Sequence, residues 1–119
     1  MRGRSGMESA KERIDALFKA EARELLGNLA RGLTVLGRGG GDEALLRKMA
    51  RDAHTLRGSA TMMGYAAAAA AARAVEESFE AAGGGGIPPG GEHFAALRRC
   101  VERLVEALDR GAPPPPRRG

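Results

Sequence analysis

Apolar residues recur every three or four positions along most of this chain, which is the spacing that gives a helix one buried face. The pattern predicts four helices, over residues 9–37, 42–63, 65–82 and 92–110. Short connections lie between them, most of them rich in glycine, which favours turns. Four helices joined in this way pack most simply when each runs antiparallel to the one before. We therefore expect an all-α fold, an antiparallel up-down-up-down four-helix bundle.

The first predicted helix is the longest and carries its own start signal. Ser9 and Glu12 have the spacing of a capping box, in which each side chain hydrogen-bonds the backbone amide of the other residue. Its apolar stripe is Ile14, Leu17, Phe18, Ala22, Leu25, Leu29, Leu33 and Leu36. We expect residues 1–8 to be a disordered tail, residues 9–110 to be the bundle, and residues 111–119 to be a stiff proline-rich linker to a further domain.

The second predicted helix holds a histidine away from its buried face. At about 100° per residue, one side of this helix gathers Leu45, Met49, Ala53, Leu56, Ala60 and Met63. His54 lies almost opposite, together with Arg47, Ala50, Gly58 and Thr61, so we expect the imidazole to be in water. Glycine inside a helix costs about 1 kcal/mol relative to alanine. Gly58, one turn after His54, is therefore expected to clear space around the ring.

Arg57 supplies this histidine with a cation. It follows His54 by three residues, close enough to bring its charge beside any group that the imidazole carries. A histidine that accepts and surrenders a phosphoryl group needs an unprotonated ring nitrogen, a nearby positive charge and room for a partner protein. The alternative is a structural or solvated histidine without chemistry, which is the commoner role of a lone histidine in a helix.

The net charge of +4 and the pI near 10.0 do not indicate a nucleic-acid-binding protein. Four arginines, Arg2, Arg4, Arg117 and Arg118, lie at the chain ends, and without them the 19 basic residues fall to 15, equal to the 15 acidic ones. Both signs mix along the predicted helices, and only 3% of the residues are aromatic. The sequence therefore offers neither a basic stripe nor the stacking side chains that bind nucleic acid.

Other classes of function find no support in the sequence. No apolar run is long enough to cross a membrane, and the N-terminus lacks the apolar core of a signal peptide, which favours a cytoplasmic location. Cys100 is the only cysteine, so no internal disulfide is expected. His54 and His93 have no carboxylate–histidine pair at inward helical spacing, and the glycine runs do not have the setting of a nucleotide-binding loop. We expect no bound metal or cofactor.

The run His54-Thr-Leu-Arg-Gly58, followed by Gly64 and Tyr65, resembles the motif of histidine-containing phosphotransfer (HPt) domains, His-x-x-Lys/Arg-Gly. Two segments of the first predicted helix narrow the resemblance. Leu17-Phe-Lys-Ala-Glu-Ala-Arg-Glu-Leu-Leu26 and Gly32-Leu-Thr-Val-Leu36 are similar to the opening helix of the P1 domain of CheA-type chemotaxis histidine kinases. The resemblance spans residues 10–110. It implies a monomeric four-helix bundle that is a fragment of a larger kinase.

The resemblance implies a role for each of five residues. His54 is the phosphoacceptor, which takes the γ-phosphoryl group of ATP from a separate histidine kinase catalytic domain and passes it to an aspartate of a CheY-like response-regulator receiver domain. Arg57 helps to neutralise the phosphoryl oxygens, and Gly58 is the clearance position. Glu76 hydrogen-bonds the imidazole and fixes its tautomer, while Arg73, where many P1 domains have a second histidine, holds Glu76 or adds positive charge. The alternative for Arg73 and Glu76 is a simple exposed pair.

On this interpretation the domain is not an enzyme on its own. ATP and Mg²⁺ are used by its partner domains, and these partners dock on the exposed ridge of Arg47, Ala50, Gly58 and Thr61. Two alternatives to this interpretation remain. One is an HPt domain of another kind. The other, in a different functional class, is a structural adaptor bundle in which His54 is incidental.

Overall fold

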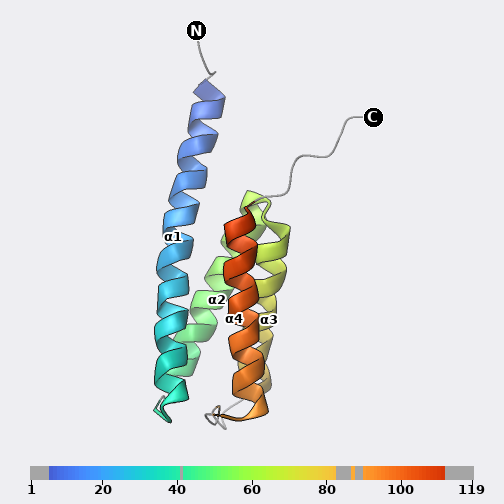
Figure 1. Ribbon diagram of the computed structural model, residues 1–119. Coiled ribbons are helices and arrows are strands. Elements are labelled where there is room, and N and C mark those ends of the chain that lie inside the picture. The colour runs from blue at the N-terminus through green and yellow to red at the C-terminus, as the bar shows by residue number, and fades with distance from the viewer. Residues whose placement is uncertain (1–5, 41, 83–86, 88–89, 112–119) are drawn as a thin grey trace, which may run out of the picture.

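Helices make up most of the described chain. The computed structural model describes residues 6–40, 42–82, 87 and 90–111. Its helices are α1 (Gly6–Gly37), α2 (Glu43–Met63), α3 (Ala66–Ala82) and α4 (Glu92–Arg110), and the residues described contain no strand. Each helix runs antiparallel to the one before it, and the four lie side by side (Figure 1). The predicted all-α, up-down-up-down four-helix bundle is confirmed.

α1 begins earlier than the sequence predicts. Its backbone is helical from Gly6, so Ser9 lies inside the helix and the prediction that the helix starts at Ser9 is wrong. Methionine, glutamate, alanine and lysine are good helix formers, and no proline stops the helix from extending back past the capping signal. The predicted disordered tail, residues 1–8, therefore overlaps α1. Its residues 1–5 lie outside the described chain, as do residues 112–119 of the predicted linker.

One face of each helix contributes to a single core. The long side chains from α1 and α4 that are almost fully buried include Leu29, Leu36, Leu97 and Leu104. α2 and α3 also contribute small buried side chains, which include Ala53, Ala60, Ala68 and Ala72. Small side chains between two helices allow the helix axes to approach each other. The polar residues at the edge of the α2–α3 contact are therefore also within reach of one another.

Local signals fix both ends of α2. The Oδ1 atom of Asp42 accepts a 2.9 Å hydrogen bond from the amide of Leu45, which makes Asp42 the N-cap of the helix. Gly64 ends the helix with a φ of 83°, a left-handed conformation that glycine adopts at little cost. The amide of Tyr65 donates back to α2 at 2.9 Å, and α3 begins at Ala66, one residue later than predicted. This short turn sets the register of α3 against α2.

The N-terminal part of α1 extends past the turn between α2 and α3 (Figure 1). Tyr65 in that turn contacts it. The Tyr65 hydroxyl donates a 2.7 Å hydrogen bond to Asp15, and the ring centroids of Tyr65 and Phe18 are 4.8 Å apart. The hydrogen bond from Tyr65 holds the pKa of the Asp15 carboxyl below its ordinary value. Tyr65 thus adds a polar and an aromatic contact to the packing that holds α1 against the rest of the bundle.

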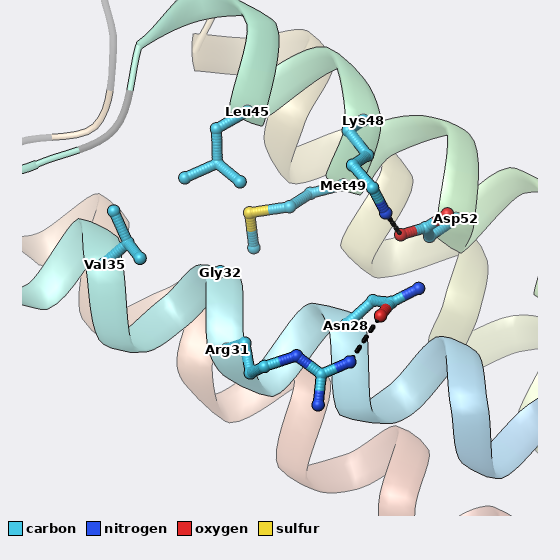
Figure 2. A pocket seen from close by; sticks show the side chains of 8 residues that line it. All are labelled: Asn28, Arg31, Gly32, Val35, Leu45, Lys48, Met49 and Asp52. Atoms are coloured by element: carbon cyan, nitrogen blue, oxygen red, sulfur yellow. Dashed lines mark hydrogen bonds and ion pairs between the residues drawn. The ribbon is translucent and has the colours of Figure 1, made fainter.

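α1 and α2 approach each other closely at Gly32. A Cβ atom at this position would overlap the Sδ, Cε and Cγ atoms of Met49, whose side chain is 1% exposed. Figure 2 shows Met49 reaching from α2 toward the backbone of α1 at Gly32, beside a hollow of about 190 Å³ whose lining includes Lys48 and Asp52. Met49 therefore fills the space that a side chain at Gly32 would need.

We expect Gly32→Ala to be less stable than Gly27→Ala, a matched variant on the same helix. Both variants gain about 1 kcal/mol of helix propensity, but a Cβ at Gly27 meets only Arg31, at 3.4 Å. At Gly32 the overlap with Met49 adds a repacking cost of about 1–3 kcal/mol. Urea unfolding of the two variants measures the difference. Equal free energies of unfolding would mean that Met49 moves aside without cost, against this account of the packing.

Candidate functional site

His54 projects from the middle of α2, away from the core. Its side chain is 64% exposed, whereas Ala53 and Leu56 on the same helix are fully buried. This exposure agrees with the prediction from the apolar stripe of α2. The imidazole is open to a molecule that approaches from solvent.

Glu76 on α3 is the hydrogen-bond partner of this imidazole. Its Oε2 atom lies 2.6 Å from Nδ1 of His54, and its side chain is 15% exposed. A carboxylate oxygen and a ring nitrogen with a lone pair would repel each other at this distance, so the geometry assigns the ring proton to Nδ1, which donates to Glu76. The other ring nitrogen, Nε2, is left with its lone pair.

Arg57 is bound primarily to Glu76. Its Nε atom donates a 2.7 Å hydrogen bond to Oε1 of Glu76, and its Nη2 atom lies 3.1 Å from Nδ1 of His54. Because Nδ1 already carries a proton directed at Glu76, this second contact brings a cation near the ring without a hydrogen bond to it. His54, Arg57 and Glu76 together form what we call the His54 cluster.

The charge of Glu76 is maintained by its two partners. Burial by itself would raise the pKa of this carboxyl, but the hydrogen bonds from Arg57 and His54 outweigh burial and hold the pKa below its ordinary value. Glu76 is therefore a carboxylate throughout the neutral pH range. An ionised carboxylate on Nδ1 favours the tautomer in which Nε2 is unprotonated.

Arg73 lies beside the His54 cluster without bonding to it. Its Nε atom donates a 3.2 Å hydrogen bond to Oε2 of Glu77, and both side chains are exposed. Arg73 and Arg57 line a common hollow of about 290 Å³ that also includes Glu76 and Glu80. Arg73 therefore forms an exposed ion pair, as the alternative interpretation expected, but its partner is Glu77 and not Glu76.

The four residues expected to form a docking ridge all lie on α2, but they differ in their contacts. Arg47 pairs with Glu43 at 3.2 Å, Ala50 is half-buried, and the hydroxyl of Thr61 donates to a backbone carbonyl at 2.8 Å. A Cβ added at Gly58 would have nothing within 4 Å. An alanine there would not crowd His54, so the predicted clearance does not serve the ring within the isolated domain.

An apolar patch near this ridge was missed by the sequence analysis. Ile14, Leu17 and Met62 have exposed fractions of 52%, 70% and 84%, and they border hollows between α1 and the end of α2. The prediction that Ile14 and Leu17 are buried is wrong, because at this level of α1 the core takes in Phe18, whereas Ile14 and Leu17 line open hollows beside Met62. We call these three residues the apolar patch.

Within the described ranges, no helix is long and apolar enough to cross a membrane, and no group of three or more histidine, cysteine or acidic side chains could hold a metal ion. His93 has its own contact, because its Nε2 atom lies 2.7 Å from the carbonyl oxygen of Ser78. This contact joins the start of α4 to α3 and lies outside the His54 cluster.

Comparison with known proteins gives one match. The model of a family described as Hpt domain matches residues 13–107, which include all four helices in whole or in large part. No match was found among curated proteins or among solved structures.

We expect Glu76→Gln to lower the free energy of unfolding by about 1–3 kcal/mol at neutral pH, because the amide loses the charge that pairs with Arg57. Since the pKa of Glu76 is lower in the folded than in the unfolded chain, its carboxylate stabilises the fold above the ordinary value of 4.5. This contribution disappears as the pH falls through the folded value. The measurement is chemical unfolding of both proteins from neutral to acid pH.

Glu77→Gln is the matched control for this experiment. Its side chain is 60% exposed in the pair with Arg73, and the loss of an exposed pair has little effect on stability. The unfolding free energies of the wild type and Glu76→Gln are expected to converge in acid. A gap that stayed constant at every pH would contradict the pairing of Glu76 with Arg57 and His54 described above.

Proposed function

Because the chain belongs to the Hpt domain family, we propose that His54 is the residue through which it carries phosphoryl groups between two-component signalling proteins. Hpt domains are phosphotransfer modules and are not catalytic by themselves. The observation that carries the assignment is the 2.6 Å contact between Nδ1 of His54 and Glu76. In the neutral ring, this contact leaves the lone pair on Nε2, the nitrogen that acts as the nucleophile.

Uptake of the phosphoryl group uses three side chains of this domain. The lone pair of Nε2 attacks the γ-phosphorus of ATP, which is held by a separate histidine kinase catalytic domain. The Nε2–P bond forms as the P–O bond to ADP breaks. The proton on Nδ1 stays on the ring, which becomes cationic, and the carboxylate of Glu76 stabilises this charge. Arg57 keeps Glu76 in position through its 2.7 Å hydrogen bond.

Onward transfer uses the same ring nitrogen. A carboxylate oxygen of an aspartate on a receiver domain attacks the phosphorus, the Nε2–P bond breaks, and its electron pair returns to Nε2. The domain itself binds no cofactor in this scheme, since ATP belongs to the kinase domain and Mg²⁺ to the receiver domain. Glu76 keeps the proton on Nδ1 through both steps.

More specifically, we propose that this chain is the P1 domain of a CheA-type chemotaxis kinase. It is then monomeric and cytoplasmic, and a CheY-like receiver domain accepts its phosphoryl group. The sequence of α1 and the run from His54 to Gly58 support it, because both resemble P1 domains. Arg73 departs from the P1 pattern, where many members have a second histidine. Because position 73 is an arginine, which pairs with Glu77, the His54 cluster contains a single imidazole.

We propose that the partner's docking surface extends from the ridge of α2 onto the apolar patch. Met62 follows His54 by eight residues, a distance of about 12 Å along the helix axis. Gly58, between them, has no side chain to separate the two. A protein that brings an aspartate to Nε2 would cover both positions, and clustered exposed apolar side chains are typical of interaction surfaces.

We expect His54→Gln to fold normally and to take up no phosphate. The test incubates the chain with a CheA-type kinase catalytic fragment and labelled ATP, followed by acid and alkali treatment. Label on the wild type that is acid-labile, alkali-stable and absent from the variant identifies phosphohistidine at His54. No label with several kinases, in a protein that is helical, would favour the structural adaptor instead.

We expect Met62→Lys to slow phosphoryl transfer to a CheY-type receiver domain by at least about tenfold, which corresponds to about 1.4 kcal/mol. Met62 is 84% exposed, so its replacement leaves the free energy of unfolding nearly unchanged. Val105→Lys, at a 39% exposed position on α4, is the matched control. The apolar patch has no part in docking if both variants transfer at the wild-type rate.

A further inference from the structure

The basic side chains of α2 differ in whether they have an acidic partner. The helix carries four of them, and three have an acidic partner: Arg47 with Glu43 at 3.2 Å, Lys48 with Asp52 at 3.0 Å, and Arg57 with Glu76 at 2.7 Å. The fourth, Arg51, is exposed and has no hydrogen bond or ion pair to any residue in the described part of the chain. Its guanidinium is therefore available to a group that the free domain lacks.

Arg51 lies beside His54, on the side opposite Arg57. It precedes His54 by three residues, as Arg57 follows it by three, so both are neighbours of the ring on the helix surface. At about 100° per residue they lie roughly 60° to either side of His54. Arg57 is on the side that faces α3, because it bonds to Glu76 there. Arg51 is therefore on the side away from α3.

This is also the side to which the reactive nitrogen points. The two nitrogens of an imidazole face opposite edges of the ring, and Nδ1 of His54 is directed at Glu76 on α3. Nε2 is then directed away from α3. A phosphoryl group on Nε2 adds up to two negative charges and three acceptor oxygens, on the same side of α2 as Arg51.

From this arrangement we propose that Arg51 is the main ligand of the phosphoryl oxygens on His54, a role that rests on the proposed function of the domain. A guanidinium group attracts phosphoryl oxygens by its positive charge and by charge-assisted hydrogen bonds, and the charge is the part that a lysine also supplies. Arg57 is bound to Glu76 through Nε and lies on the Nδ1 side of the ring, whereas Arg51 lies on the other side and gives up no partner. Arg57 then positions Glu76, and Arg51 binds both the incoming phosphoryl donor and the product.

A small donor tests this role without a partner protein. Phosphoramidate transfers its phosphoryl group directly: the Nε2–P bond forms, the P–N bond of the donor breaks, and ammonia leaves with the electron pair. The full chain is treated with potassium phosphoramidate, and phosphohistidine is followed by intact mass and phosphorus NMR. The variants are Arg51→Gln, Arg51→Lys, His54→Gln and, as a matched control, Arg99→Gln at an exposed position on α4.

We expect Arg51→Gln to be phosphorylated about tenfold more slowly than the wild type, a smaller loss than in an enclosed site because the charge is exposed to solvent. Arg51→Lys keeps most of the rate, and Arg99→Gln keeps all of it. Added salt slows the wild type toward the rate of Arg51→Gln and hardly affects that variant. Thermal unfolding is the same for the wild type and the Arg51 and Arg99 variants, which separates this role from a structural one.

Two results would overturn the role of Arg51 and leave the proposed function intact. One is a wild-type rate in Arg51→Gln, and the other is equal slowing in Arg51→Gln and Arg51→Lys, which would exclude charge as the cause. A wild type that takes up no phosphate, or label that persists in His54→Gln, would instead overturn the proposed function and this inference with it.

Discussion

The hydrogen bond between His54 and Glu76 joins residues 22 positions apart, and the rest of the fold determines whether they meet. The cap at Asp42 and the left-handed Gly64 set where α2 starts and stops. The turn at Tyr65 sets where α3 begins, and small buried side chains allow α2 and α3 to approach each other. A helix that slipped by one residue would rotate Glu76 by about 100° and leave Nδ1 without its acceptor. The tautomer of one exposed ring thus depends on the register of two helices.

Most helix boundaries could be predicted because their signals are local. A glycine ends a helix by its backbone preference and an aspartate starts one by its capping side chain. Such signals lie at Gly37, Asp42 and Gly64, and the bounds 92–110 of the last helix were also predicted. Similarly, the exposure of His54 follows from helical periodicity alone. The contact with Glu76 was suggested only by the resemblance to P1 domains, since no spacing within one helix relates two helices.

The features that the sequence did not predict depend on neighbours. Ile14 and Leu17 belong to the apolar stripe of α1, but burial also needs neighbouring side chains that cover them, and the core at this level covers Phe18 and leaves Ile14 and Leu17 exposed. Arg73 has acids at both three and four residues further along. It pairs with Glu77 because Glu76 is already bound by His54 and Arg57. Where a side chain has several possible partners, the one that it binds depends on the contacts of the assembled structure.

At Gly58, the residue that would be best for stability differs from the residue that the proposed signalling role would favour. The folded domain makes no use of the missing side chain, because a Cβ there would touch nothing within 4 Å, and alanine would strengthen the helix by about 1 kcal/mol. A library of variants screened for thermal stability alone would therefore enrich alanine at this position. A library screened for signalling would retain glycine to the extent that a partner's backbone must come close to His54, so the two screens together would reveal how near the partner approaches.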